Sequence, residues 1–259
     1  MNTMLFDQII FGPVKSRRLG ISLGVNLLPV NGKLCNFDCI YCECGLNKDS
    51  SGLNKKLPTS EEVYSALNEK LSDMLQKAEA PDVITFAGNG EPTMHPDFAD
   101  IIDNTIILRN HYFPKTLISV LSNATMLHKH DVVDALKKVD QNVLKLDSGN
   151  LTTIRLINQP IGKYDLKKIT AQLKSFNGKL IIQTMFTRGM VNNNSFDNTS
   201  QEDLQSWENI VNTVHPEKVM IYTIDRNTPF DGLKKIPVDE LKKIASRIEK
   251  YGIPVQVSG

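Results

Sequence analysis

Segments with the apolar pattern of buried strands alternate with amphipathic helical segments along nearly the whole chain. Two consecutive strands that are joined through a helix lie parallel in one sheet, because the helix carries the chain back to the starting edge. The alternation therefore predicts an α/β protein with a mostly parallel sheet that is covered on both faces. The predicted strands are residues 20–28, 83–87, 117–121, 143–146, 180–186 and 219–224, with a short further strand at 253–257, and the predicted helices begin at residues 59, 97, 131, 165, 201 and 238.

Six strand–helix units leave two architectures open. One is an open, doubly wound sheet, and the other is a sheet that curls into part of a barrel. A closed barrel of this class has eight units, so we predict a partial (β/α)6 barrel. Residues 1–259 are expected to form a single domain, in which residues 1–20 are an N-terminal extension and residues 20–257 are the partial barrel.

The first predicted helix illustrates how the elements are recognised. Thr59 precedes Glu62 by three residues, which is the capping-box pattern of a helix N-terminus. An apolar stripe follows and should face the sheet. Its predicted members are Val63, Leu67, Leu71, Leu75 and Ala78.

Composition and charge indicate no strong general partner. Lys and Arg number 30 and Asp and Glu number 29, so the net charge of +1 predicts no overall attraction to nucleic acid or to a membrane surface. No apolar run approaches the roughly 18 residues of a membrane helix. Asp7 and Gln8 interrupt the opening apolar stretch, which does not resemble a signal peptide. We therefore expect a cytoplasmic protein with no membrane partner, in a compartment where thiols stay reduced.

All four cysteines of the chain lie between Cys35 and Cys44, in the loop after the first predicted strand. The first three have the spacing C-x3-C-x2-C, and three thiolates on one loop can converge on a soft metal centre. Zinc is an alternative, but zinc sites usually combine two separated ligand pairs, and neither a distant cysteine nor a suitably spaced histidine pair is present. Three ligands leave one position open, which favours an iron–sulfur cluster with an iron that binds substrate.

Polar residues also follow the other predicted strands, where both candidate architectures place an active site. Such residues are common at strand ends even without a function, because strand ends meet loops. The candidates are residues 88–92 (Gly-Asn-Gly-Glu-Pro), Ser122, Asn123, Asp147, Ser148, Gln183, Thr184, Arg188, Thr223, Asp225 and Arg226.

The spacing of Cys35, Cys39 and Cys42, with the aromatic Tyr41 directly before the last cysteine, resembles the radical S-adenosylmethionine (radical SAM) superfamily. The resemblance implies a radical SAM type of partial barrel and a [4Fe-4S] cluster on these three cysteines. It also implies that SAM binds the fourth iron and is cleaved by one electron to methionine and a 5'-deoxyadenosyl radical, which abstracts hydrogen from a substrate. Tyr41 would contact the adenine, and flavodoxin or ferredoxin would supply the electron.

A second motif, Asn89-Gly90-Glu91-Pro92, is similar to the Gly-Gly-Glu element of the same superfamily, which holds the methionine amino group. Asn89 replaces the usual first glycine. Gly90 permits close backbone approach, and the Glu91 carboxylate suits an ammonium group. The resemblance further implies that Asn123 and Asp147 contact the ribose and the carboxylate of SAM.

Residues 11–20 and 222–226 resemble a prokaryotic group related to the wyosine tRNA-base synthases. Those enzymes condense pyruvate onto N1-methylguanosine, with a second cluster on three further cysteines and a lysine that forms a Schiff base. Only Cys44 remains here after the first three cysteines, so a second cluster of that kind cannot be built. The wyosine reaction itself is therefore disfavoured.

Three hypotheses for function follow. The first is a radical SAM enzyme that acts on an unidentified substrate, for which the resemblance favours an RNA base or nucleotide. The second is an activase that abstracts hydrogen from a glycine of a partner protein, and the third is a non-catalytic thiolate module that binds metal or senses redox state. Three features have open roles at this level: the thiol of Cys44, the basic run of Lys15, Arg17 and Arg18, and Lys145, which is either a lumen residue or an ion-pair partner of Asp147.

Overall fold

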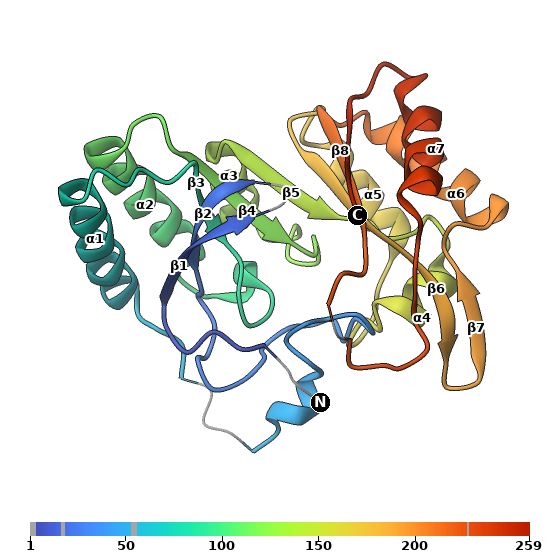
Figure 1. Cartoon of the computed structure of the whole chain (residues 1–259), viewed down its shortest axis with the longest axis horizontal. Helices are drawn as coiled ribbons and strands as arrows, with labels where there is room; N and C mark the ends of the chain where they lie inside the picture. The colour runs from blue at the N-terminus through green and yellow to red at the C-terminus, as the bar shows by residue number, and fades with distance from the viewer. Residues whose placement is uncertain (1–3, 17–18, 53–55, 227) are drawn as a thin grey trace.

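The computed structural model describes residues 4–16, 19–52, 56–226 and 228–259 (Figure 1). Strands and helices alternate from β2 to β10, as the sequence predicts. The elements are β1 Ile10–Ser16, β2 Gly20–Val25, α1 Ser60–Gln76, β3 Val83–Phe86, α2 Phe98–Tyr112, β4 Leu117–Ser122, α3 His130–Lys138, β5 Gln141–Lys145, α4 Leu151–Ile157, α5 Leu166–Lys174, β6 Ile181–Val191, β7 Asn194–Asp197, α6 Gln201–Val214, β8 Lys218–Thr223, β9 Lys234–Lys235, α7 Val238–Glu249 and β10 Val255–Ser258.

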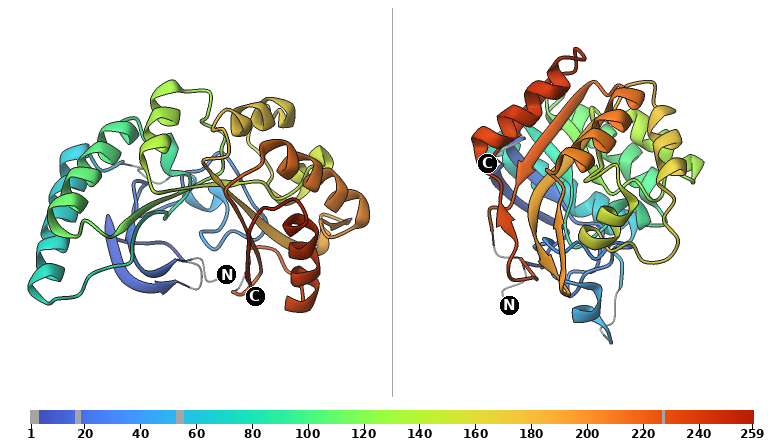
Figure 2. Two further views of the ribbon diagram at one scale, coloured as in Figure 1. Left: turned by 90° about the horizontal axis from the view of Figure 1, so that it is seen from above. Right: turned by 90° about the vertical axis from the view of Figure 1, so that its right-hand side faces the viewer.

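The main sheet has the strand order β1-β2-β3-β4-β5-β6-β8-β10. All neighbours from β2 to β10 are parallel, and only β1, at one edge, is antiparallel to its neighbour. Figure 2 shows that the sheet curves into an arc with the helices along its outer side. The predicted partial barrel is therefore confirmed. Its parallel strands direct their carboxyl ends, and the loops that follow them, to the same side of the molecule.

The hydrophobic core lies between this sheet and the helices. In register, Val25 lies beside Phe86 and Phe86 lies beside Val120, and all three side chains are fully buried. Trp207 of α6 is buried in the same core, where its indole N–H donates to the Thr184 hydroxyl at 3.0 Å. Each large apolar side chain buried in this way stabilises the fold by roughly 1.5–3 kcal/mol.

Helix α1 confirms the capping box but corrects the predicted stripe. The Thr59 hydroxyl accepts a hydrogen bond from the backbone of Glu62, whose carboxylate accepts one from the backbone of Thr59. Met74 is buried, whereas Leu75 is 51% exposed and Ala78 lies beyond the helix end with a φ of 56°. A run of four-residue steps drifts around a helix of 3.6 residues per turn, so a three-residue step is needed to return to the sheet.

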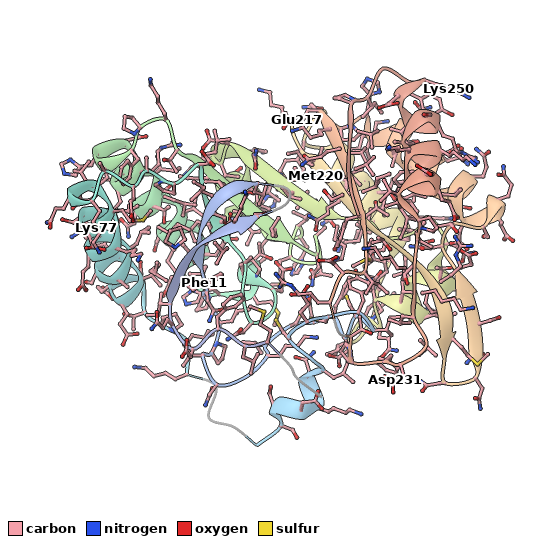
Figure 3. The ribbon with its side chains drawn as sticks, in the orientation of Figure 1. Phe11, Lys77, Glu217, Met220, Asp231 and Lys250 are labelled. Carbon is pink, nitrogen blue, oxygen red and sulfur yellow. The ribbon has the colours of Figure 1, made fainter. Side chains whose placement is uncertain are left out.

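The N-terminal residues are more than an extension. Residues 10–16 form β1, which pairs antiparallel with β2 and joins the sheet. Phe11 lies on this strand (Figure 3), where its ring covers Gly24 so closely that a Cβ there would lie 2.1 Å from it. The expected N-terminal extension therefore contributes an antiparallel edge strand to the sheet, ahead of the parallel strands that begin with β2.

Besides β1, the helix α4 and the strands β7 and β9 have no counterpart among the predicted elements. Helix α4 has only seven residues, too few to show a helical period, and it begins at the cap residue Asn150. Strand β6 continues beyond residue 186 to Val191, where β7 and β9 pair with it antiparallel. These short, polar strands are paired by their backbones, so their sequences show no apolar alternation. Within the described ranges, no helix has the length and apolar character required to cross a membrane.

Candidate active site

A cavity of about 290 Å³ opens at the carboxyl ends of the parallel strands. Its walls come from the loop after β2, the loop after β3 and the ends of β4, β5, β6 and β8. All four cysteines line it, so the fold brings the two sequence motifs and several strand ends to one place. The other polar residues in its walls are Lys33, Tyr41, Glu43, Glu91, Ser122, Asn123, Lys145, Gln183 and Tyr222.

The cysteine loop is joined to the second motif by its backbone. Leu34 donates to the carbonyl of Asn89 at 2.9 Å and accepts from the N–H of Glu91 at 3.1 Å. Gly90, between them, has a φ of +143°, and a Cβ at this position would lie 1.9 Å from the carbonyl oxygen of Leu34. Only glycine can therefore sit at this junction.

The departure of Asn89 from the usual glycine has a structural reason. Its side-chain amide donates to the carbonyls of Phe6 and Pro29 at 2.8 Å, and its oxygen accepts from the N–H of Phe6 at 2.9 Å. Asn89 is fully buried. This side chain thus ties the segment before β1 to the loops that carry the cysteines and Glu91.

The other side of the cysteine loop rests on the end of α4. Ile40 donates to the carbonyl of Ile157 at 2.9 Å, and Asp38 donates to that of Asn158 at 3.1 Å. Phe37, Ile40 and Tyr41 are buried against α4 and β6 in a second hydrophobic cluster. The loop is therefore held in place before any cofactor binds.

Two of the cysteine sulfurs accept hydrogen bonds from nitrogen donors. Cys35 Sγ accepts from the backbone of Phe37 at 3.4 Å and from the Asn123 amide at 3.7 Å, and Cys39 Sγ accepts from the Asn158 amide at 3.4 Å. Donors of this kind stabilise thiolates and tune iron–sulfur clusters. In the described part of the chain, no three His, Cys, Asp or Glu side chains are arranged around a single metal ion. The donor set of three thiols with N–H bonds to sulfur fits an iron–sulfur cluster.

The pKa of the thiol is shifted differently at Cys35, Cys39 and Cys42. Burial raises the pKa of Cys35, and it raises the pKa of Cys39 to about 11. A hydrogen bond from the Cys44 thiol, helped by the charge of Lys33, lowers the pKa of Cys42 to about 6. Cys42 is therefore the thiol that ionises most readily near neutral pH.

Lys33 is a buried cation beneath this loop. Its side chain is 1% exposed, and its ammonium donates to Asp38 at 3.2 Å and to the Gly45 carbonyl at 2.9 Å. Burial alone would lower the pKa of Lys33, but negative charge on Cys42, Cys35, Cys39 and Asp38 raises it above its ordinary value. The lysine thus offsets negative charge that accumulates on the thiolates.

Glu91, from the second motif, and Asn123, directly after β4, lie together on the cavity wall. One oxygen of the buried Glu91 carboxylate accepts from the N–H and hydroxyl of Thr93, and the other accepts from the N–H of Asn123 at 2.6 Å. Burial raises the pKa of Glu91, although these hydrogen bonds oppose the rise. The carboxylate is therefore fixed in orientation next to Cys35.

Asp147 does not line the cavity, in contrast to the other predicted SAM-contacting residues. Its carboxylate accepts from the hydroxyl of Tyr41, from the Asn158 amide at 2.6 Å and from the N–H of Met185 at 2.9 Å. Lys145 donates to the Tyr41 oxygen at 2.8 Å and lies 3.5 Å from Asp147. Asp147 therefore holds Tyr41 and Lys145 in position, and these two side chains line the cavity.

Lys145 combines the two roles that its sequence position left open. It lines the cavity and it is paired with Asp147. Burial would lower the pKa of Lys145, but the charge of Asp147 raises it, so the ammonium stays protonated. Burial and Asp147 likewise raise the pKa of Tyr41 well above its ordinary value, so the phenol stays neutral.

Sequence reasoning missed Lys33 and Asn158 and did not single out Tyr222. Lys33 is two residues before Cys35, so its proximity to the motif was the signal that could have found it. Asn158 follows α4, whose short length gave no signal. Of the basic run, Lys15 is exposed on β1 and outside the cavity lining, while Arg17 and Arg18 lie outside the described residues.

Several predicted strand-end residues have structural roles instead. Arg188 pairs with Glu240 and Asp197, and the Thr223 hydroxyl accepts from the N–H of Ile236. Arg226 does reach the site, because it pairs with Glu43 of the cysteine loop at 2.5 Å. The Cys44 sulfur lies 3.2 Å from the carbonyl oxygen of Gly88, which competes with Cys42 for its single proton.

Both the sequence and the fold are similar to those of known proteins. The family model described as the radical SAM superfamily matches residues 32–197. A UPF0026 protein of Helicobacter pylori strain J99 is 32% identical over 239 residues, which are 91% of this chain and 72% of that protein. A protein of Brachyspira hyodysenteriae named GTPase Obg is 29% identical over 245 residues, which are 93% of this chain, and the chain spans only 33% of its length.

Two solved structures share the fold at low sequence identity. A radical SAM methyltransferase from Sphaerobacter thermophilus has a TM-score of 0.66 at 12% identity, covering 92% of this chain and 65% of that chain. TYW1 with a lysine–pyruvate adduct bound has a TM-score of 0.63 at 18% identity, covering 88% of this chain and 73% of that chain. These similarities establish the architecture, while the family match rests on sequence.

Proposed function

This chain belongs to the radical SAM superfamily and is a relative of the UPF0026 proteins, and from that membership we propose that Cys35, Cys39 and Cys42 hold its [4Fe-4S] cluster. Enzymes of this superfamily use such a cluster together with SAM. This membership argues against the third hypothesis, a non-catalytic module that binds metal or senses redox state. When bound, the cluster supplies the electron that cleaves SAM to methionine and a 5'-deoxyadenosyl radical, which abstracts hydrogen from the substrate.

The observation that carries the assignment is the shared cavity wall of the three thiols. Nitrogen donors point at the sulfurs of Cys35 and Cys39, and the ammonium of Lys33 lies buried beneath the same loop. These donors and the ammonium oppose the rise in pKa that burial causes at Cys35, and the Asn158 amide does so at Cys39, which favours thiolate ligands. The loop is also anchored on both sides, so its geometry does not depend on the cofactor alone.

We assign the SAM-binding roles to residues that line the same cavity. Glu91, held by Thr93 and Asn123, would attract the amino group of SAM, and Gly90 lets the backbone approach it. Tyr41 would contact the adenine, and Asn123 would donate or accept at the ribose or carboxylate. Asp147 is a positioning residue in this proposal, because its carboxylate is occupied by protein donors.

For the substrate we propose an RNA base or nucleotide. The segment 222–226, which carries part of the resemblance to the wyosine synthases, lies at the cavity, with Tyr222 in its wall and Arg226 paired to the cysteine loop. Lys145 adds a protonated ammonium to the wall, where it can pair with a substrate carbonyl or phosphate. An electron donor such as flavodoxin or ferredoxin completes the reaction, and a protein glycine is the alternative substrate.

Two further proposals concern the molecule as a whole. Residues 1–259 form one domain, a proposal that the continuous sheet from β1 to β10 supports. The cytoplasm is the proposed location, because reduced thiols are required for the cluster and are maintained there.

The decisive experiment is anaerobic reconstitution of the full chain with iron and sulfide, followed by dithionite and SAM. We expect 5'-deoxyadenosine to form, and its formation to be abolished in Cys39→Ala but retained in the matched variant Cys44→Ala. Reconstituted protein that holds a cluster yet cleaves no SAM would contradict the proposal. Deuterium transfer from labelled RNA to 5'-deoxyadenosine, or a glycyl radical on a partner protein, would then identify the substrate class.

A further inference from the structure

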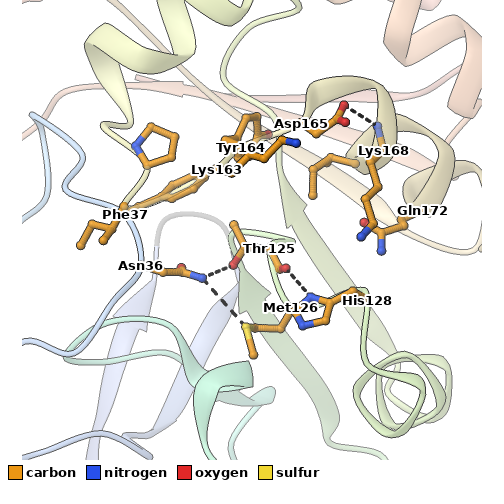
Figure 4. A pocket seen from close by; sticks show the side chains of 13 residues that line it. Asn36, Phe37, Thr125, Met126, His128, Lys163, Tyr164, Asp165, Lys168 and Gln172 are labelled. Carbon is orange, nitrogen blue, oxygen red and sulfur yellow. Dashed lines mark hydrogen bonds between the residues drawn. The ribbon is translucent and has the colours of Figure 1, made fainter.

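A second and larger cavity, of about 390 Å³, lies beside the first one. Its walls come from the cysteine loop, from the turn after β4 and from residues 160–172 before and within α5 (Figure 4). Phe37 is the lining residue that the two cavities have in common. The volume lies within the range of small-molecule sites, and the active-site proposal leaves this cavity without a role.

Some polar side chains of this cavity have hydrogen-bond partners, and others have none. The oxygens of Thr125 and Asp165 are engaged, since Thr125 bonds with Asn36 and Asn123, and Asp165 caps α5 by accepting from the N–H of Lys168 at 3.1 Å. In the described residues, the ammonium groups of Lys163 and Lys168 have no hydrogen-bond or ion-pair partner. Both lysines are exposed at the mouth of the cavity, so the lining offers two cations against one engaged carboxylate and favours an anionic ligand.

Helix α5 directs a third donor to the same place. Figure 4 shows the side chains of Lys168 and Gln172 extending together from α5, as expected for residues one helical turn apart. The Gln172 amide likewise has no partner among the described residues. Two ammonium groups and an amide can surround one group that has several acceptor oxygens, and phosphate is the common group with that chemistry.

The remainder of the cavity is apolar. Ile161, at its rim, is 57% exposed, and Phe37 is buried in its floor with the ring of Tyr164 at 5.7 Å in an edge contact. The exposed Ile161 and the half-buried Tyr164 ring offer apolar surface that a flat, unsaturated ring can cover. The ligand therefore combines a phosphate with a flat ring system.

Hydrogen bonds connect this cavity with the proposed cluster. The Asn36 amide donates to Thr125 at 2.5 Å, Asn123 donates to the Asn36 oxygen at 2.6 Å, and the same Asn123 amide lies 3.7 Å from Cys35 Sγ. A ligand that moves Thr125 or Asn36 must therefore alter a hydrogen bond to a cysteine sulfur. Occupation of the second cavity would be visible in the spectrum of the cluster.

We propose that this second cavity binds a nucleoside monophosphate, with its phosphate at Lys163, Lys168 and Gln172 and its base against Ile161 and Tyr164. The same chemistry is available from a free nucleotide and from a nucleotide within an RNA chain. The proposal stands apart from SAM cleavage, because it rests on groups outside the active-site cavity.

The test is calorimetric titration of the reconstituted full chain in the presence of saturating SAM, which occupies the active-site cavity. The probes are guanosine and adenosine monophosphates, the corresponding nucleosides, inorganic phosphate and a short single-stranded RNA. We expect saturable binding of a monophosphate that is at least about tenfold tighter than binding of its nucleoside, because charge-assisted hydrogen bonds to phosphate are lost without it. Tighter binding of the RNA than of the monophosphates would identify RNA as the source of the nucleotide.

Variants of the lysines localise the binding. The double variant Lys163→Ala with Lys168→Ala should weaken binding of the monophosphate by at least about tenfold. The matched control, Lys167→Ala with Lys174→Ala, removes the same charge from α5 outside the cavity lining and should leave the affinity unchanged. Gln172→Glu, which adds a negative charge to an exterior helix position, should weaken binding as well.

Two outcomes would overturn the proposal. One is the absence of saturable binding by every phosphate-bearing probe to a chain whose thermal unfolding is normal. The other is an equal loss of affinity in the cavity pair and in the control pair, which would indicate general attraction to positive charge. Since neither readout involves 5'-deoxyadenosine, failure here would leave the proposed SAM cleavage untouched.

Discussion

Gly90 shows how a single residue holds the active site together. The Leu34 carbonyl occupies the space where any larger residue at position 90 would place its Cβ. The close approach lets the cysteine loop and the Glu91 loop share two backbone hydrogen bonds. The glycine is thus required for the contact between the two sequence motifs, in addition to its conformational freedom.

We predict that Gly90→Ala destabilises the chain by about 3 kcal/mol or more, because it adds a steric clash to an unfavourable φ. Urea denaturation would measure the loss. The control is Gly252→Ala, where φ is +77° but nothing lies within 4 Å of the added Cβ, so only about 1 kcal/mol of backbone strain is expected. Equal losses in the two variants would show that the contact with Leu34 is unimportant.

Cys44 changes its neighbour although it lies outside the three-cysteine motif. Its thiol donates toward Cys42 and lowers the pKa of that thiol to about 6. In the chain without metal, Cys42 should therefore be a thiolate above about pH 6 and a thiol below it. The fourth cysteine thus favours the thiolate form of Cys42, one of the three proposed cluster ligands.

Cys44→Ala should move this ionisation to higher pH by about one unit or more, because the thiolate loses its hydrogen bond and stays buried. Thiolate absorbance of the metal-free chain, followed against pH under anaerobic conditions, measures the shift. Cys35→Ala, which removes a different thiol, should retain the ionisation of Cys42 near pH 6. An unchanged titration in Cys44→Ala would rule out the proposed coupling.

At the scale of elements, the site depends on loops that are joined by side chains rather than by regular structure. Asn89 connects the segment before β1 with the loop after β3, and Asn158, after α4, connects Cys39 with Asp147. Amide side chains suit this task because each one can donate and accept at the same time. Elements that are far apart in sequence are thereby fixed around one cavity.

Replacing Asn89 with glycine, the residue usual in the superfamily motif, should release the N-terminal segment. The loss of three buried hydrogen bonds is expected to destabilise the chain by about 2–3 kcal/mol, and residues 4–9 should exchange their amide hydrogens faster. Hydrogen-exchange mass spectrometry makes the measurement, with the exposed Asn194→Gly as control. Unchanged protection of residues 4–9 would contradict the role of Asn89.

The whole molecule has room for one cluster of this type. Every cysteine lies on a single loop, and three of them are the proposed ligands of one [4Fe-4S] centre. The sheet is occupied by six crossovers, and the second cavity shares the cysteine loop with the first. Both cavities therefore belong to the carboxyl edge of the sheet, where α/β folds place their ligands.

Reconstituted protein should contain about four iron atoms per chain. Iron and sulfide analysis, together with Mössbauer spectroscopy, measures this stoichiometry. Cys44→Ala should retain the iron, and Cys42→Ala should lose most of it. A content near eight iron atoms per chain would contradict the single-cluster assignment and would require ligands from outside the cysteine loop.

The architecture and the motifs could be predicted from sequence because their signals are local. The apolar pattern of 83–87 or 117–121 marks a strand by itself, and parallel connections then limit the topology. The spacing of Cys35, Cys39 and Cys42 places three thiols on one loop whatever the remainder of the chain does. Family membership confirms the superfamily that this spacing indicated, while the ligand roles of the three residues stay a prediction.

Only the tertiary structure decided how the polar residues are used. Asp147 and Lys145 share a strand end, yet one is buried behind Tyr41 and the other lines the cavity, because α4 and β6 close over the carboxylate. The pairing of Asn89 with Phe6, and of Asn158 with Cys39, joins positions more than 80 residues apart. Contacts of that range depend on packing of the whole sheet, so no spacing along the chain could reveal them.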